Sequence, residues 1–208
     1  MKLIILGATG GTGLELIRRS LLHGHSVTAF VRASHGLEEF RDRITVRQGN
    51  VLDRNALAQV LQGHDAVLSA FGPRVPIAKS DAHLLEGFAT VLTHAMTDAG
   101  LRRAVIISTA FLFKDSIIPP TYLIGKLLFP TVVTDSAALE GIFQKSDLDW
   151  TIVRPPQLTD TPFTGSYRVR LGHLPRMGFK IGRADVAEYF VQAAADHTLI
   201  RKVVGLSN

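Results

Sequence analysis

The feature that most constrains this chain is a short apolar segment that leads directly into a glycine-rich turn. Residues 3–6 are all apolar, Gly7, Gly10 and Gly13 follow at regular intervals, and a helical pattern begins near Leu14. Glycine permits a tight turn and a close approach of other groups, because it carries no side chain. The order strand, glycine turn, helix predicts that the turn and the start of the helix bind a phosphate group.

Apolar segments and helical patterns alternate along most of the chain. Strands are predicted at residues 3–6, 27–31, 44–46, 66–70, 104–107 and 151–153, and helices at 12–23, 54–62, 81–99, 135–147 and from 183 or 184 to 195. Such alternation is typical of a parallel sheet that helices cover on both faces. We therefore predict an α/β fold, a Rossmann-type doubly wound parallel sheet, in which residues 1–208 form a single domain. Residues 155–182, rich in proline and glycine, are predicted to form a small C-terminal region of substrate-side loops.

The composition argues against several other kinds of protein. The chain has no cysteine, which excludes disulfides, thiolate metal sites and cysteine nucleophiles, and no other residues are spaced for a metal site. The net charge of +5 is spread along the chain, so no nucleic-acid partner is predicted. The apolar segment 117–133 contains Lys126 and several prolines, so no membrane span is predicted. We expect a cytoplasmic protein that is a monomer or a weak homodimer.

The glycine-rich turn predicts that the chain binds a dinucleotide. The candidate contacts in the turn are Gly7, Ala8, Thr9, Gly10, Gly11, Thr12 and Gly13. The type of cofactor is indicated at the end of the second strand, where an NAD-binding protein places Asp or Glu against the ribose 2′-hydroxyl. This chain has Arg32 there, followed by Ser34 and His35. A guanidinium binds a 2′-phosphate through paired hydrogen bonds, so we predict that the cofactor is NADPH. The alternative is that Arg32 stacks on the adenine or faces solvent.

Further cofactor contacts are predicted in the segments that follow the third and fourth strands. The first segment is expected beside the adenine, and the second is expected where the ribose and pyrophosphate pass. The candidate residues are Asn50, Val51, Ala70, Phe71, Gly72 and Arg74. Taken alone, each segment is equally compatible with an ordinary turn.

Several segments of the chain resemble one known family. The glycine turn, the Val-Arg pair that ends in Arg32 and the Gly-Asn-Val-Leu-Asp segment 49–53 resemble the NAD(P)H-binding, NmrA-like branch of the atypical short-chain dehydrogenases. The second half is similar to the biliverdin-IXβ reductase group, also called flavin reductases. The segments that carry this similarity are 108–113, 119–120, 149–156 and 164–167. The similarity covers nearly the whole chain, apart from a few extra residues around 122–130.

The resemblance also implies where the nicotinamide ring would lie. It places Thr109, with Ser108 adjacent, beside the nicotinamide, and it places Pro155 and Pro156 at the border of the ring. Gln157 stands where the reductase group has a histidine close to the bound substrate. We therefore expect Gln157 to form a hydrogen bond with the acceptor.

Tyr122 and Lys126 match the Tyr-x-x-x-Lys pattern of mainstream short-chain dehydrogenases. In that pattern the tyrosine acts as an acid or base, and the lysine one helical turn later lowers the pKa of the tyrosine. The pair lies in a strongly apolar segment bordered by prolines. A structural lid is the preferred interpretation of this segment, and a catalytic dyad is the alternative.

Together these features predict an NADPH-dependent reductase that transfers hydride to a planar conjugated acceptor, namely a flavin, a quinone or a bilin. Thr109 would orient the nicotinamide or the acceptor. One alternative is a non-catalytic NADP(H)-binding redox sensor of the NmrA type. Gln157 and Ser136, which replace two histidines of the reductase group, are compatible with this alternative. A second alternative is a nucleotide-sugar epimerase or dehydratase, which would require the Tyr122–Lys126 dyad.

Overall fold

The fold is built on a central sheet of eight strands in the residues that the computed structural model describes, 1–73, 83–116 and 120–208. The strand order is β3-β2-β1-β4-β5-β6-β10-β8, and neighbouring strands are parallel except for β10 and β8. The strands are β1 (Lys2–Leu6), β2 (Ser26–Val31), β3 (Thr45–Gln48), β4 (Ala66–Ser69), β5 (Arg103–Ile107), β6 (Asp149–Arg154), β8 (Arg168–Leu171) and β10 (Lys202–Ser207). A separate small parallel pair joins β7 (Gln157–Thr159) to β9 (Lys180–Gly182). The predicted α/β fold is confirmed.

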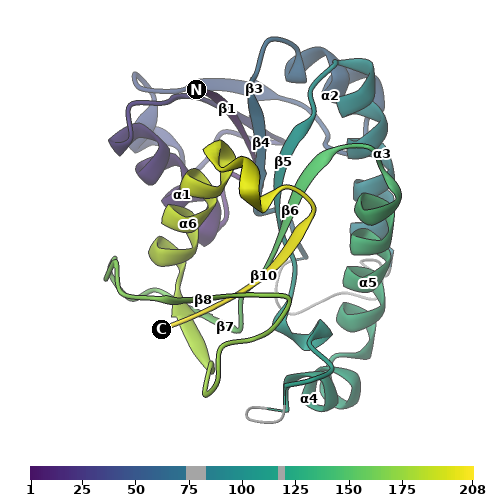
Figure 1. Cartoon of the computed structure of the whole chain (residues 1–208). Coiled ribbons are helices and arrows are strands. Elements are labelled where there is room, and N and C mark those ends of the chain that lie inside the picture. The colour runs from purple at the N-terminus through teal and green to yellow at the C-terminus, as the bar shows by residue number, and fades with distance from the viewer. Residues whose placement is uncertain (74–82, 117–119) are drawn as a thin grey trace.

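Helices cover both faces of the sheet (Figure 1). The helices are α1 (Gly11–Leu22), α2 (Arg54–Leu61), α3 (Leu84–Asp98), α4 (Thr121–Leu128), α5 (Pro130–Lys145) and α6 (Arg183–Ala195), with short 3-10 turns η1 (Glu38–Phe40), η3 (Ala110–Leu112) and η4 (His197–Leu199). α1 and α6 lie side by side on one face, and α2, α3 and α5 lie on the other. This arrangement is the doubly wound architecture that the sequence predicts.

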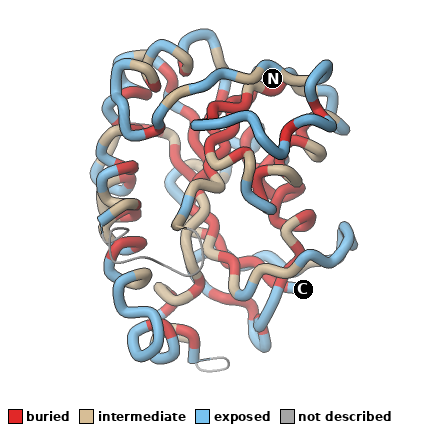
Figure 2. The backbone as a smooth tube through the Cα atoms, turned by 180° about the vertical axis from the view of Figure 1, so that it is seen from behind, coloured by how far each residue is buried: buried red, intermediate tan, exposed pale blue. Residues whose placement is uncertain are grey.

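The alternation of side chains along β1 explains why this strand lies at the centre. Leu3 and Ile5 belong to the apolar core beneath α1 and α6, whereas Ile4 and Leu6 belong to the core beneath α2, α3 and α5. All four side chains are fully buried, and Figure 2 shows buried residues running through the sheet between exposed helix surfaces. A strand covered on both faces needs apolar residues at every position, which is the pattern that identified it in the sequence.

Four elements, α5, α4, β10 and β3, differ clearly from the sequence-based prediction. α5 begins at Pro130 and ends at Lys145, whereas the sequence predicts a helix over residues 135–147. Proline is favourable at the first position of a helix, because an N–H group at that position would have no partner within the helix. α4 and β10 were not predicted as regular elements. β3 is largely exposed at the edge of the sheet, and it spans Thr45–Gln48 rather than the predicted apolar segment 44–46.

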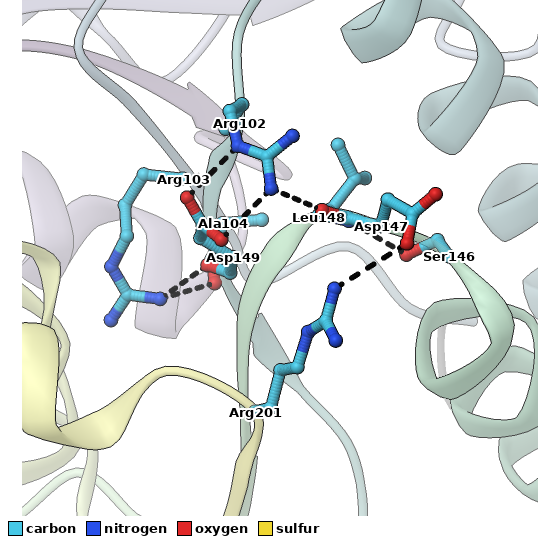
Figure 3. Close-up of polar contacts among 8 residues, drawn as sticks. All are labelled: Arg102, Arg103, Ala104, Ser146, Asp147, Leu148, Asp149 and Arg201. Carbon is cyan, nitrogen blue, oxygen red and sulfur yellow. Dashed lines mark hydrogen bonds and ion pairs between the residues drawn. The ribbon is translucent and has the colours of Figure 1, made fainter.

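A network of arginines holds the amino ends of neighbouring strands together (Figure 3). Arg102 donates to the carboxylate of Asp149 at 3.2 Å and to the carbonyl of Asp147 at 2.5 Å. The buried Arg103 donates to the carbonyl of Asp149 at 2.6 Å, and Arg201 approaches the carboxylate of Asp147 at 3.6 Å. These contacts join the starts of β5, β6 and β10. The amino ends of the strands lie opposite to the carboxyl ends, where open α/β sheets bind ligands.

α4 is an apolar helix that packs on only part of its surface. Gly125 lies against Phe111, since a Cβ at Gly125 would come within 2.5 Å of the Phe111 side chain. Leu123, Leu127 and Leu128 are exposed. No single helix in the described part of the chain is long and apolar enough to cross a membrane; α4 and α5 reach that length and composition only as a pair bent by 115°.

The buried carboxylate of Asp185 connects α6 to the segment that follows β7. Asp185 accepts hydrogen bonds from the backbone N–H groups of Thr164 and Gly165 at 3.0 Å, from the Thr164 hydroxyl at 2.8 Å and from Asn208 at 3.0 Å. Burial alone would raise the pKa of this carboxyl, but the hydrogen bonds outweigh burial and lower the pKa. Asp185 therefore anchors the chain end and the predicted substrate-side segment to α6.

We expect Asp185→Asn to lower the free energy of unfolding at pH 7 by on the order of 2 kcal/mol, because an amide cannot accept all of these hydrogen bonds. The folded chain lowers the pKa of Asp185, so the ionised carboxylate stabilises the fold at neutral pH. This contribution is lost as the pH falls through the folded pKa, below the ordinary value of about 4. Denaturant unfolding between pH 7 and pH 2 should therefore show a flatter pH dependence in the variant.

Asp147→Asn is the matched control for this measurement, because the Asp147 carboxylate is fully exposed. Its effect on stability should stay within about 0.5 kcal/mol. Equal stability of the wild-type chain and Asp185→Asn at pH 7 would contradict the anchoring role.

Candidate functional site

A cleft of about 830 Å³ opens at the carboxyl ends of the parallel strands. Its walls come from the loops after β1, β2, β3, β4 and β5, with additional side chains from α3, β7 and α6. The lining residues are Gly7, Ala8, Thr9, Gly10, Gly11, Thr12, Phe30, Val31, Arg32, Asn50, Val51, Leu52, Ala70, Phe71, Gly72, Pro73, Leu84, Ile107, Ser108, Leu158 and Arg183. The volume lies within the range of small-molecule sites, roughly 300–1,000 Å³.

Two glycines determine the shape of the turn at the centre of this cleft. Gly7 has φ +76°, and a Cβ there would lie 2.7 Å from the backbone of Ala70 and Phe71. A Cβ at Gly13 would lie 2.1 Å from the carbonyl oxygen of Gly7. The turn therefore requires glycine at both positions, and it brings the start of α1 against the end of β1.

The start of α1 is suited to an anion. The helix begins at Gly11 and has no acidic residue in its first turn. The first N–H groups of a helix lack partners within the helix, and the helix dipole favours negative charge at this end. The glycine turn and the start of α1 thus form a cradle that fits the pyrophosphate of a dinucleotide.

The charged side chains that line the described part of the cleft are both arginines. Arg32 is exposed at the end of β2, and Arg183 is the first residue of α6. No Asp or Glu is among the described lining residues, so the cleft favours a polyanionic ligand. Arg74, a predicted contact, lies outside the described residues.

The loop after β3 forms another wall and is held by its own side chains. The Asn50 side-chain oxygen accepts from the N–H of Leu52 at 3.1 Å, and Asp53 caps α2 by accepting from the N–H groups of Asn55 and Ala56. Asn50 and Val51 line the cleft, as do Ala70, Phe71 and Gly72. Ser34 is exposed and does not line the cleft.

Ser108 and Thr109, which follow β5, have different surroundings. Ser108 lines the cleft, and its hydroxyl donates to Glu140 at 2.6 Å. The Thr109 hydroxyl instead accepts from the N–H of Phe111 at 3.2 Å and caps η3. The family resemblance implies that Thr109, with Ser108 adjacent, lies beside the nicotinamide, whereas in the structure it is Ser108 that lines the cleft.

Glu140 is a buried carboxylate with a fixed set of partners. It is 3% exposed and receives hydrogen bonds from Arg154 at 2.6 and 2.9 Å. Arg154 also donates to the carbonyl of Leu112 at 3.1 Å. Because the hydroxyl proton of Ser108 is donated to Glu140, the Ser108 oxygen has its lone pairs free to accept a hydrogen bond from a ligand.

Three predicted residues after β6 are not among the described residues that line the cleft. The carbonyl of the buried Pro155 accepts from the N–H of Ala110 at 3.0 Å. Gln157 begins β7 with an exposed side chain, and Leu158 is the residue of this strand that reaches the cleft. Pro156 does not line the cleft either. Roles for Pro155, Pro156 and Gln157 beside the nicotinamide stay predictions.

Tyr122 and Lys126 do not line the described cleft. Both belong to α4, where the Tyr122 ring lies 5.7 Å from the ammonium group of Lys114 and Lys126 is exposed. Tyr167, another residue of the C-terminal half, packs edge-on against Tyr189. Burial raises the pKa of Tyr167 to about 12, so its hydroxyl stays protonated at neutral pH.

Arg183 is the main cleft residue that sequence reasoning did not identify. The sequence predicted it only as a possible first residue of the last helix. One signal was available: a cation in the first turn of a helix is disfavoured by the dipole, so a basic residue there suggests a role other than helix stability.

Comparison with known proteins agrees with this geometry. The sequence pattern of the NAD(P)H-binding family matches residues 7–197, from the glycine turn to just beyond α6. The chain belongs to this family. It also shares the Rossmann-type α/β fold of solved NAD(P)-binding structures, as the resemblance of its sequence predicts.

Relatives of this NAD(P)H-binding chain come from distant organisms. A chloroplastic protein of Arabidopsis thaliana, At2g34460, is 30% identical over 98% of this chain and 75% of its own length. A short-chain dehydrogenase/reductase of Veillonella parvula, solved in complex with NADP, has a TM-score of 0.82 and 21% identity, covering 100% of this chain and 94% of that one. ChuY of Escherichia coli O157:H7, described as an anaerobilin reductase, has a TM-score of 0.82 and 20% identity, covering 100% and 97%.

We expect Gly13→Ala to destabilise the fold by on the order of 2 kcal/mol or more and to weaken NADP(H) binding, because the added methyl group collides with the Gly7 carbonyl. Gly87→Ala is the matched control, since Gly87 is exposed within α3 and has no atom within 4 Å of its added Cβ. That control should be stabilising by about 0.5–1 kcal/mol. Denaturant unfolding and a titration with NADPH measure both effects, and an equally stable Gly13→Ala would show that the close approach is not required.

Proposed function

We propose that this chain is an NADPH-dependent reductase that transfers hydride to a planar conjugated acceptor, namely a flavin, a quinone or a bilin. The observation that carries the proposal is the cleft itself, which joins a glycine turn, Arg32 and Ser108 in one cavity without an acidic lining residue among those described. The relatives that are solved with NADP or described as an anaerobilin reductase support it.

The proposed cofactor contacts follow the cleft. The turn and the start of α1 would hold the pyrophosphate, Arg32 the 2′-phosphate, and the loop after β3 the adenine. The proposed contacts are Gly7, Ala8, Thr9, Gly10, Gly11, Thr12, Arg32, Asn50, Val51, Ala70, Phe71, Gly72 and Ser108. Gly13 acts from behind the turn by allowing α1 to approach β1.

The chemistry follows from what surrounds the inner part of the cleft. Bound NADPH supplies the hydride, and the chain binds, orients and shields the reactants. Leu84, Ile107 and Leu158 present apolar surface, and the Ser108 oxygen can accept a hydrogen bond from an N–H group of the nicotinamide amide or of the acceptor. The described lining contains no His, Asp, Glu, Lys or Tyr, so the proton is expected from solvent, which suits flavins and quinones.

The single-domain organisation is part of the same proposal. The segment 155–182 contributes Leu158 to the cleft and is tied to α6 through Asp185, which supports one domain that carries both the substrate side and the cofactor side. The cytoplasmic location and the monomeric or weakly dimeric state stay predictions.

The direct test is turnover. We expect the purified chain to oxidise NADPH, followed at 340 nm, in the presence of at least one acceptor among FMN, riboflavin, menadione and biliverdin. Tyr122→Phe should keep the full rate, because Tyr122 does not line the cleft. Tight NADPH binding without turnover of any acceptor would contradict the reductase and favour the NmrA-type redox sensor, and loss of turnover in Tyr122→Phe would restore the dyad hypothesis.

Arg32 should determine the choice between the two nicotinamide cofactors. We expect Arg32→Ala to weaken NADPH binding by about tenfold or more while leaving NADH binding nearly unchanged, because only NADPH carries the 2′-phosphate. Titration of the intrinsic or cofactor fluorescence gives both dissociation constants. Equal weakening of the two cofactors would show that Arg32 contacts the adenine rather than the phosphate.

A further inference from the structure

We propose that Arg183 is a second phosphate-binding residue, whose guanidinium binds the pyrophosphate of the dinucleotide beside the first residue of α1. In the free chain this guanidinium is paired with Asp160, and the pyrophosphate replaces that partner. The inference rests on the proposed function, since it requires a dinucleotide in the cleft.

The position of Arg183 supports this role. Arg183 lines the cleft, and its side chain lies across the first residue of α1, since a Cβ at Gly11 would meet its Cδ and Nε at 3.0 Å. α6 and α1 lie side by side (Figure 1), and the first residues of both helices line the cleft. The guanidinium is therefore next to the backbone amides that receive the anion.

The ion pair between Arg183 and Asp160 is weak. Arg183 donates to Asp160 at 2.6 Å, but the Asp160 side chain is 87% exposed, whereas that of Arg183 is 27% exposed. An ion pair with so exposed a carboxylate contributes little to stability. A pyrophosphate offers more charge and a set of oxygens that matches the fork of a guanidinium, so it competes well for Arg183.

Electrostatics at the helix end point the same way. Arg183 is the first residue of α6, where the helix dipole disfavours a cation. A bound anion in the cleft would compensate this unfavourable placement. None of the described residues that line the cleft is acidic, so no carboxylate inside the cleft competes with the ligand for the guanidinium.

The two arginines of the cleft should have separable effects. Arg32 lies at the end of β2, where the 2′-phosphate is expected, and Arg183 lies at the start of α1. NADH and NADPH share the pyrophosphate, and only NADPH has the 2′-phosphate. Removal of Arg183 should thus weaken both cofactors by the same factor, in contrast to removal of Arg32.

The test measures dissociation constants of NADPH and NADH by isothermal titration calorimetry. Arg183→Met keeps an unbranched stem over Gly11 and removes the charge, and we expect it to weaken both cofactors about tenfold or more. Arg201→Ala is the control for the loss of one positive charge, since Arg201 does not line the cleft and its side chain lies beside Asp147, before the start of β6 (Figure 3). The control should bind both cofactors as the wild-type chain does.

Two further measurements sharpen the assignment. Adenosine 2′-monophosphate lacks the pyrophosphate, so its affinity should be unchanged in Arg183→Met and reduced in Arg32→Ala. Asp160→Asn removes the competing partner and should bind NADPH as tightly as the wild-type chain or up to about threefold more tightly. Weaker binding by Asp160→Asn would contradict the exchange of partners.

The possible failures can be told apart. A wild-type chain that binds neither cofactor contradicts the proposed function and, with it, this inference. A wild-type chain that binds both, with Arg183→Met unchanged or weakened for NADPH alone, overturns the inference and leaves the proposed function intact. The melting temperature of each variant is measured without ligand. Should Arg183→Met not fold, Arg183→Lys keeps the charge but not the paired hydrogen bonds, and it should weaken both cofactors equally.

Discussion

The rest of the structure depends on the contact between Gly13 and the carbonyl of Gly7. No side chain fits between them, because a Cβ at Gly13 would lie 2.1 Å from that oxygen. This contact brings the start of α1 directly against the end of β1, a central strand whose residues 3–6 are fully buried. The unpaired amides of the helix then face the cleft, and the loops after the neighbouring strands complete its walls.

The charges of the site are arranged in two ways. At the cleft surface the described charged residues are Arg32 and Arg183, which suit a ligand that carries several phosphates. Behind the surface, Glu140 and Arg154 form a buried pair that satisfies both charges and orients the Ser108 hydroxyl. This arrangement suits an anionic ligand and still presents a neutral, acceptor-type oxygen where the reaction is proposed to occur.

Much of the fold could be predicted because its physical causes are local in the sequence. Apolar residues at every position mark strands covered on both faces, as in β1, and three- and four-residue spacing marks α3. β10 and α4 escaped prediction for different reasons. β10 is recognisable only by its pairing with β6 and β8, and α4 lies in an apolar segment bordered by prolines, which break the helical pattern on both sides.

The sequence by itself determined the class of fold, the glycine cradle and the presence of an arginine in place of an acidic residue after β2, because each depends on neighbouring residues along the chain. Only the tertiary structure decided which of two adjacent hydroxyls, Ser108 or Thr109, faces the cleft, since that depends on Glu140 from α5. The same holds for Arg183, which is distant from Gly11 in sequence and meets it because α6 packs beside α1. Residues far apart in the chain become partners only through packing, which no local pattern encodes.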